Sequence, residues 1–346
     1  MAALSKSPNP LISFVIPTLN AAIILPACLH SIRRQKTSGF SIEIIIADGG
    51  STDGTQKIAH KFKAKIVHNP LKTAESGKAI GAKHAKGAYI ALIDSDNLLP
   101  SASWLSVMLK PFNLVPSLIA TEPIKFTYRR QAGFIERYSA LFGANDPYAF
   151  VCGITDRQNF INFRWTSLKL AVKDYPDFLL LTLIAGTPLP TLGANGTIYR
   201  ASFLKKLLTA DYLFDIDIIS QYLIHNSSSL LFAKVKIGII HTFCESSITK
   251  FIRKQNRRLV DYYYYQPLRS FNWGQANSLG IVKFTLYSLT ILPSLFDSLR
   301  GYFHRPDPAW FFHPLACLLS WFIYTKVTLA KFFHLLKPVN RLSWRQ

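Results

Sequence analysis

The sequence is poor in acidic residues and has no closely spaced cysteines. It contains 40 lysines and arginines against 19 aspartates and glutamates, a formal surplus of 21 positive charges. A surplus of this size favours nucleic acid, an anionic lipid surface or a phosphorylated substrate as a partner, without choosing among them. The four cysteines, Cys28, Cys152, Cys244 and Cys317, form no CxxC pair. This spacing argues against a zinc site or a disulfide framework and favours a reducing compartment.

Two further features are missing. No internal repeat with a period of about 20–50 residues is present. The N-terminal segment has a short polar lead and one strand-length apolar run, and it lacks the long apolar stretch of a secretory signal peptide. We therefore expect the protein to remain in the cytoplasm. Its 346 residues allow one large α/β domain with an appendage, or two domains.

Apolar runs alternate with helical patterns over the first hundred residues or so. Continuous apolar runs predict buried strands at 11–16, 42–50, 64–69 and 88–96, and the segments between them predict helices at 21–35, 54–63 and 76–86. This alternation is typical of a parallel, doubly wound α/β sheet. In such sheets ligands bind beyond the carboxyl ends of the strands, which is where Asn20, Asp48 and Asp94 fall.

Acidic side chains follow two of these strands. Asp48 and Asp53 lie in "IIIADGGSTDGT", where carboxylates can accept hydrogen bonds from a base or a sugar hydroxyl and the glycines allow close backbone approach. Asp94 and Asp96 form a D-x-D pair in "LIDSDN", a spacing that suits a divalent cation bridging substrate phosphates. Lys78, upstream of that pair, is available to meet phosphate charge.

The order and spacing of these motifs resemble the nucleotide-sugar half of family 2 glycosyltransferases with the GT-A fold. The resemblance rests on "FVIPTLN", "IIIADGGSTDGT" and "GKAIGAKHAKGAYIALIDSD", and it covers residues 12–115. It continues more weakly through 191–200, 213–219 and 237–241. It implies a mixed, mostly parallel GT-A sheet and a nucleoside-diphosphate sugar as donor, with Mg²⁺ or Mn²⁺ as cofactor.

The resemblance also implies roles for particular residues. Those that would bind the nucleotide sugar are Pro17, Asn20, Asp48, Asp53, Gly77, Lys78, Asp94 and Ser95. Asp96 and His241 would hold the metal. The acceptor-side loop would comprise Gly193, Ala194, Asn195 and Gly196.

The catalytic base is less sharply defined by the resemblance. The family usually presents Glu-Asp at the start of a helix, and here the sequence reads "FDID", so either Asp215 or Asp217 could serve, with Asp215 preferred. Gln255 and Arg258 loosely match a Q-x-x-R-W element on the acceptor side. Leu259 replaces its tryptophan, which argues against processive polymerisation.

Each of these residues also has an ordinary structural interpretation. Asp48 could be a turn residue, because Asp and Gly favour turns in any protein. Asp94 could cap a helix, although Asp96 two residues later is harder to explain in that way. Asp215 and Asp217 could be a capping pair, and His241 could be a surface histidine at a strand end. The ordered series of motifs favours the functional interpretation for the group.

The composition shifts towards the C-terminus, and hydrophobic residues make up 49% of the chain. We expect a glycosyltransferase domain at 1–245 (halves 10–115 and 116–245), a basic and aromatic connector at 246–275, and hydrophobic helices at 276–346. Two stretches, 278–299 and 309–333, are long enough for the roughly 20 apolar residues of a bilayer span, but both contain charges and prolines. A helix pair in the membrane interface, a spanning hairpin and two core helices of a soluble domain remain alternatives.

These observations predict a membrane-associated, inverting, metal-dependent glycosyltransferase at the cytoplasmic face of the cell membrane. It would transfer a sugar to a lipid-linked or cell-surface glycan acceptor in cell-envelope biosynthesis. The alternatives are a polyprenyl-phosphate sugar transferase and a non-catalytic nucleotide-sugar-binding protein. A nucleic-acid partner is not expected, because the sequence has no RNP, KH or helix-turn-helix signature and its carboxylates would repel phosphate unless a metal intervened.

Overall fold

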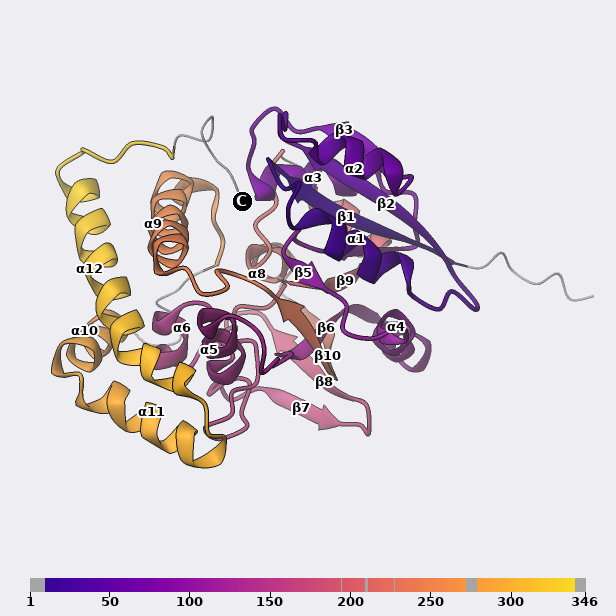
Figure 1. Ribbon diagram of the computed structural model, residues 1–346. Coiled ribbons are helices and arrows are strands. Elements are labelled where there is room, and N and C mark those ends of the chain that lie inside the picture. Colours follow the sequence, from indigo (N-terminus) through magenta and orange to yellow (C-terminus); the bar gives the residue numbers. More distant parts are fainter. Residues whose placement is uncertain (1–9, 194, 209–210, 227, 272–278, 340–346) are drawn as a thin grey trace, which may run out of the picture.

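A single mixed sheet runs through the molecule. The computed structural model describes residues 10–193, 195–208, 211–226, 228–271 and 279–339 (Figure 1). Within these residues the sheet has ten strands, in the order β3-β2-β1-β4-β9-β6-β10-β8-β7, with the short β5 paired to β10. The predicted α/β mixed sheet is confirmed.

The N-terminal half of the sheet is parallel, as predicted. Its strands are β1 (Leu11–Thr18), β2 (Ser41–Asp48), β3 (Lys65–His68) and β4 (Tyr89–Leu92), and its helices are α1 (Leu25–Arg33), α2 (Thr55–Lys61) and α3 (Ala74–His84). Seven of the eight residues of β1 are buried, because helices cover both faces of the sheet here. The carboxyl ends of β1, β2 and β4 therefore meet at one edge.

The other half of the sheet is mainly antiparallel. Its elements are β5 (Asn97–Leu98), α4 (Trp104–Leu114), β6 (Leu118–Phe126), β7 (Ala171–Asp174), β8 (Phe178–Ile184), β9 (Thr197–Arg200), α7 (Ala201–Leu204), η1 (Lys205–Leu207), α8 (Asp217–Asn226) and β10 (Ser229–His241). β9 lies antiparallel between β4 and β6, while β10 is parallel to β6 and antiparallel to β8. Parallel pairing thus occurs at β3-β2-β1-β4 and β6-β10, and the remaining pairs reverse direction.

Helices from distant parts of the chain pack together beside this sheet (Figure 1). They are α5 (Phe134–Phe142), α6 (Pro147–Cys152), α9 (Ile248–Tyr264), η2 (Gln266–Leu268), α10 (Gly280–Thr290), α11 (Leu292–His304), η3 (Pro308–Phe311) and α12 (Phe312–Phe332). The fully buried ring of Trp310 lies 4.8 Å from that of Phe142, and Phe312 contacts Tyr138 and Phe251. An aromatic cluster therefore attaches the C-terminal helices to α5 and α9.

The first of the two long hydrophobic stretches is broken. Ile291 has a φ of 60° and Pro293 follows at the start of α11, so the stretch forms two helices, α10 and α11. Among the described residues, one helix, Pro308–Phe332, is long and apolar enough to cross a membrane. The expectation that 278–299 is long enough to span a bilayer as one helix is therefore wrong. The length and composition of the helix Pro308–Phe332 are weak evidence for a membrane span.

Candidate active site

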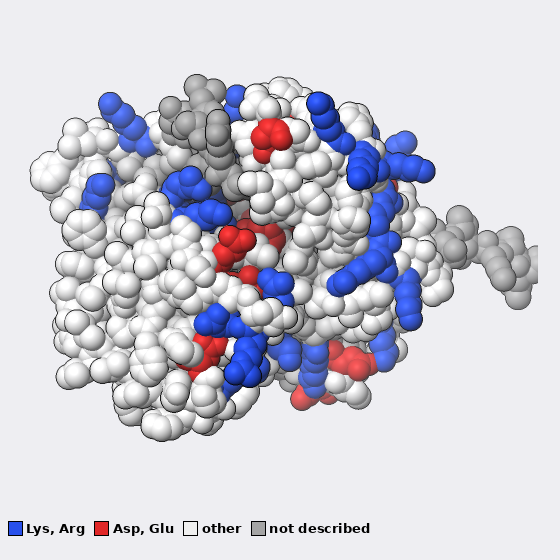
Figure 2. Space-filling model, in the orientation of Figure 1, with Lys and Arg blue, Asp and Glu red and all other residues white. Residues whose placement is uncertain are grey.

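A cavity of about 770 Å³ opens at the carboxyl ends of the central strands. Figure 2 shows a hollow in the middle of one face, with acidic side chains at its bottom and basic ones beside it. Nine of the residues predicted to be functional line the cavity: Pro17, Lys78, Asp94, Ser95, Asp96, Asn195, Asp215, His241 and Arg258. The fold thus brings together motifs that are up to about 240 residues apart in the sequence.

Asp96 and His241 meet in this cavity. Asp96 Oδ1 lies 3.4 Å from His241 Nε2, and Asp96 Oδ2 lies 2.9 Å from Lys254 Nζ. Burial raises the pKa of Asp96, but the charges of Lys254 and His241 outweigh burial and hold the pKa well below its usual range. Lys254 was not predicted, although it belongs to the basic and aromatic connector expected at 246–275.

The Asp96–His241 pair fits a divalent cation. A carboxylate oxygen and an imidazole nitrogen that converge on one cavity are suitable ligands for Mn²⁺ or Mg²⁺. The described residues contain no group of three or more His, Cys, Asp or Glu side chains that could hold a metal. A cation bound here would therefore take its other ligands from substrate phosphates and water.

Lys78 pairs with two further carboxylates of the cavity, Asp94 and Asp215. Its Nζ lies 2.9 Å from Asp94 Oδ1 and 2.5 Å from Asp215 Oδ2. Burial, opposed by the charge of Lys78, raises the pKa of Asp215 to about 7. Asp215 Oδ1 is buried without a hydrogen-bond partner among the described residues. An acceptor oxygen of this kind, on a carboxyl group with a pKa near neutrality, is suited to take a proton.

Asp217 has a different environment from Asp215. It is buried in the first turn of α8, its carboxylate accepts hydrogen bonds from the amides of Ser270 (2.7 Å) and Phe271 (2.6 Å), and it pairs with Arg269 at 2.5 Å. It does not belong to the cavity lining. The structure therefore places Asp217 where it fixes the segment after η2, and it leaves Asp215 as the candidate base.

Asn20, Asp48 and Asp53 cluster at the end of β2 and in the loops after β1 and β2, outside the cavity lining. Asp48 accepts hydrogen bonds from Thr18, Ser51 and Gln56, and these bonds lower its pKa despite the opposing effect of burial. Asp53 accepts hydrogen bonds from the amide of Ala22 (3.0 Å) and the hydroxyl of Thr55 (2.6 Å). These contacts hold the two loops together, and the nucleotide-binding role of the three residues stays a prediction.

Gly77 packs inside the fold instead of lining the cavity. A Cβ at this position would lie 2.8 Å from the Cβ of Pro17 and 3.0 Å from Nδ2 of Asn69. Glycine therefore allows α3 to lie close against β1, and this packing places the next residue, Lys78, at the cavity.

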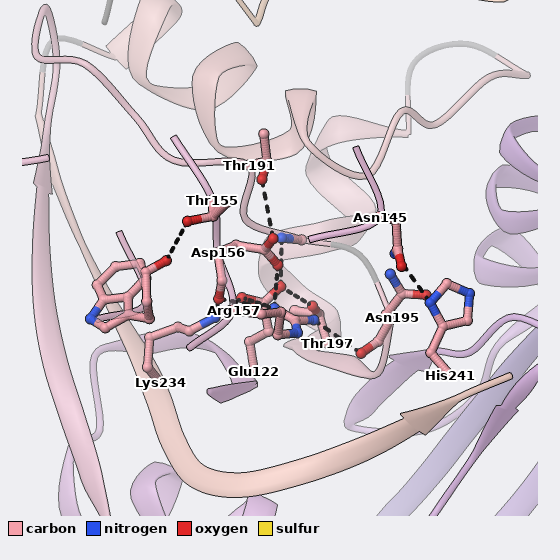
Figure 3. Close-up of polar contacts among 12 residues, drawn as sticks. Glu122, Asn145, Thr155, Asp156, Arg157, Thr191, Asn195, Thr197, Lys234 and His241 are labelled. Carbon is pink, nitrogen blue, oxygen red and sulfur yellow. Dashed lines mark hydrogen bonds and ion pairs between the residues drawn. The ribbon is translucent and has the colours of Figure 1, made fainter. Parts of the chain in front are cut away.

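A fully buried charge cluster supports the loop at 193–196 that was predicted to face the acceptor (Figure 3). Glu122 Oε1 accepts hydrogen bonds from the Gly193 amide (2.8 Å) and the Thr197 hydroxyl (2.9 Å), and Oε2 pairs with Arg157 (2.9 Å) and Lys234 (2.5 Å). The sequence signal for this cluster is the position of Glu122 and Lys234 inside two largely apolar strands, β6 and β10.

The acceptor-side loop itself is held at both ends. Gly193 has a φ of 115°, and a Cβ there would lie 2.2 Å from the carbonyl oxygen of Asp215, so only glycine fits. The Gly196 amide donates to the Leu92 carbonyl at 3.0 Å, and Arg157 donates to the Asn195 carbonyl at 3.2 Å. Ala194, also predicted for this loop, lies outside the described residues.

Gln255 and Arg258 form hydrogen bonds to a neighbouring loop. Both donate to the carbonyl of Asn145, at 2.6 Å and 3.4 Å, and the Asn145 amide lies 3.2 Å from His241 Nδ1 (Figure 3). Gln255 is fully buried outside the cavity lining, whereas Arg258 lines the cavity. Two further cations that were not predicted, Arg257 and Arg269, also line it.

Residues 13–127 match the family model described as Glycosyl transferase family 2. A PGL/p-HBAD biosynthesis glycosyltransferase of Mycobacterium tuberculosis is 35% identical over 103 residues, which are 28% of this chain and 40% of that protein. The glycosyltransferase AglE of Haloferax volcanii is 25% identical over 137 residues, 38% of this chain and 45% of that protein. The matched regions thus span less than half of each relative.

A similar fold occurs in a solved structure, the mannosyltransferase PcManGT from Pyrobaculum calidifontis in complex with GDP-Man and Mn²⁺. The alignment covers 92% of this chain and 87% of that one, with a TM-score of 0.51 and 13% sequence identity. At this identity the likeness concerns the fold, and it agrees with the α/β GT-A architecture described above.

Proposed function

We propose, from the family 2 glycosyltransferase match over residues 13–127 and the GT-A-like fold, that the protein transfers a sugar from a nucleoside-diphosphate donor with inversion. The acceptor is a lipid-linked or cell-surface glycan, and the reaction takes place at the cytoplasmic face of the membrane. One observation carries the proposal: Asp96 with His241, and Asp215 with Lys78, face the same cavity at the carboxyl ends of the strands.

The donor would bind at the ends of β1 and β4, next to Pro17, Asp94 and Ser95. Asp96 and His241 would hold the divalent cation, which supplies charge neutralisation to the departing diphosphate. That PcManGT was solved with GDP-Man and Mn²⁺ supports a nucleotide-sugar and metal requirement for this chain as well. Lys254, which pairs with Asp96, adds positive charge on the same side.

Asp215 would accept the proton of the attacking acceptor hydroxyl. Inversion requires the acceptor to attack from the face opposite the diphosphate, so base and metal must lie on different sides of the anomeric carbon. Asp215 and Asp96 belong to one cavity but have separate cationic partners, Lys78 and Lys254. Lys78 orients Asp215 and links it to Asp94, so that the base is held in place relative to the donor.

A panel of nucleotide sugars tests the proposal. The full-length protein is incubated with each donor and Mn²⁺, with and without membrane extract, and nucleoside diphosphate release is measured. We expect one donor to give release that depends on the extract and is lost in Asp215→Asn. Asp211→Asn is the matched control, because Asp211 is exposed and pairs with Lys83 at the surface. Release that does not depend on Asp215, or binding of a donor without release, would contradict the proposed reaction.

A further inference from the structure

The cavity extends beyond the carboxylates into the gap between the C-terminal helices. Its far part is lined by aromatic and aliphatic side chains of α6, α10 and α12: Tyr148, Ile281, Phe284, Trp321, Tyr324 and Leu329. The nucleotide-sugar site and this apolar part form one continuous space. A ligand can therefore occupy both parts at once.

Cationic side chains of α9 lie between the two parts. Lys254, Arg257 and Arg258 all line the cavity, as their spacing of three and four residues on a helix requires. Arg258 lies about 6 Å further along the helix axis than Lys254, which pairs with Asp96. Asp261 lies one turn beyond, and Asp146 accepts a hydrogen bond from Tyr324. Both carboxyl groups also line the cavity, so they partly offset the charge of the arginines.

The apolar part opens on an apolar surface. Ile281 and Leu329 line the cavity and are nevertheless 73% and 51% exposed, so they mark its mouth. The same helices and α11 carry other exposed apolar residues: Val282, Leu286, Leu289, Leu292, Phe296, Phe303, Phe322 and Phe332. Figure 2 shows few charged side chains over the part of this face that α10, α11 and the first half of α12 form. A surface of this kind marks an interaction with lipid or with another apolar partner.

We propose that this part of the cavity binds the acceptor as a lipid phosphate. The phosphoryl group lies beside Arg257 and Arg258, and the hydrocarbon chain runs between Phe284 of α10 and Trp321 of α12 to the mouth at Ile281 and Leu329. The inference rests on the proposed function and narrows its acceptor class to lipid-linked glycans. The arginines and the continuous apolar path to the mouth together favour this occupant, because a water-soluble glycan would use neither.

The transfer itself is that of the proposed function. The bond from the anomeric carbon to the donor diphosphate oxygen breaks, and a bond to a hydroxyl oxygen of the lipid-carried glycan forms. The proton of that hydroxyl passes to Asp215, and the nucleoside diphosphate leaves. The arginines of α9 hold the acceptor and take no part in this exchange.

Binding of farnesyl phosphate to the full-length protein in detergent tests the inference. Farnesol, which has the same chain without the phosphate, and inorganic phosphate, which has no chain, are the comparison ligands. We expect farnesyl phosphate to bind at least about tenfold more tightly than either, because charge-assisted hydrogen bonds to the arginines add to apolar contact. Equal binding of farnesol and farnesyl phosphate would overturn the phosphate site.

Matched variants separate the cavity from the surrounding surface. Arg258→Gln and Ile281→Glu should each weaken farnesyl phosphate binding by about tenfold or more. Arg253→Gln, on the same helix but outside the cavity lining, and Val282→Glu, exposed next to Ile281 but also outside it, should leave binding unchanged. If Val282→Glu binds as poorly as Ile281→Glu, the ligand is merely adsorbed to the apolar surface and the inference is wrong.

Nucleoside diphosphate binding in the presence of Mn²⁺ distinguishes this inference from the proposed function. The Arg253→Gln, Ile281→Glu and Val282→Glu variants should bind the nucleotide as the unaltered protein does. If the unaltered protein binds the nucleotide but does not prefer farnesyl phosphate to farnesol and inorganic phosphate, the acceptor site alone is refuted. If the unaltered protein does not bind the nucleotide, the proposed function is refuted.

Discussion

Replacing Glu122 by Gln is expected to cost the fold several kcal/mol. Glu122 pairs with both Arg157 and Lys234, and all three side chains are fully buried. Arg157 keeps a second carboxylate partner, Asp156, so Lys234 is the charge that loses its ion-pair partner. Removing one partner of a buried ion pair typically costs about 3–5 kcal/mol, because it leaves the opposite charge buried without compensation. Gln keeps the shape of the side chain and one acceptor oxygen for Gly193 and Thr197, so the loss reports mainly on charge.

This cost can be converted into a shift of the melting temperature. An unfolding entropy of about 2.1 cal/mol/K per residue gives about 0.7 kcal/mol/K for this chain, so that 3–5 kcal/mol corresponds to roughly 4–7 °C. The measurement is thermal unfolding of the full-length protein followed by circular dichroism. The control is Glu245→Gln, because Glu245 is 62% exposed and lies 3.8 Å from Lys250. Surface pairs of that kind contribute about 0–1 kcal/mol.

A second substitution, Lys234→Met, tests whether the lost stability is due to the buried charge of Lys234. Burial lowers the pKa of Lys234 to about 8, with Glu122 acting in the opposite direction. Without the Glu122 carboxylate, Lys234 should lose its proton more readily, and Glu122→Gln combined with Lys234→Met should recover part of the lost stability. If Glu122→Gln melts within 1 °C of Glu245→Gln, the cluster does not carry the buried charges on which this prediction depends.

The remaining predictions concern the reaction and the membrane. Asp96→Asn should reduce turnover about a thousandfold or more while leaving the melting temperature unchanged, and full activity of the unaltered protein in EDTA would refute the metal role. Asp215→Asn should abolish transfer and keep donor affinity, whereas Asp217→Asn should lower stability, because Asp217 holds Arg269 and two backbone amides; unfolding and binding assays on both separate these outcomes. The transfer rate should rise with pH through about 7, because Asp215 must lose its proton to act as a base. The contribution of Asp215 to the free energy of unfolding should fall as pH rises from about 4 to 7, since a carboxyl group with a raised pKa favours the fold only when protonated. The full-length protein should fractionate with membranes and resist a salt wash, and recovery in the soluble fraction without detergent would contradict this.

The sequence predicted those site residues that lie directly after the parallel strands. Asp94, Ser95 and Asp96 come directly after an apolar run, and the carboxyl ends of parallel strands meet at one edge, so their place at the cavity followed from local pattern. The local sequence did not decide between Asp215 and Asp217 as the base. The two residues lie at or just before the start of α8, where the direction of each side chain depends on the segments packed against it.

Partners that are distant in the sequence could not be predicted. Lys254 reaches Asp96 across 158 residues, and Lys234 reaches Glu122 across 112. The residues next to each lysine in the sequence do not indicate which carboxylate it pairs with. The break at Ile291 was missed for a related reason. From the sequence, Pro293 interrupts one long apolar segment. In the structure it lies at the start of a new helix, α11, which packs on η3 and α12.

The aromatic cluster around Trp310 has a mechanical consequence. Because Trp310 and Phe312 pack on α5 and α9, the C-terminal helices cannot tilt without moving the elements that carry Asn145 and Lys254. If the exposed face of these helices rests on a bilayer, the reacting carboxylates stand at a fixed height above the lipid. In that arrangement, a membrane-tethered glycan would be a substrate only if one of its hydroxyl groups reached this height.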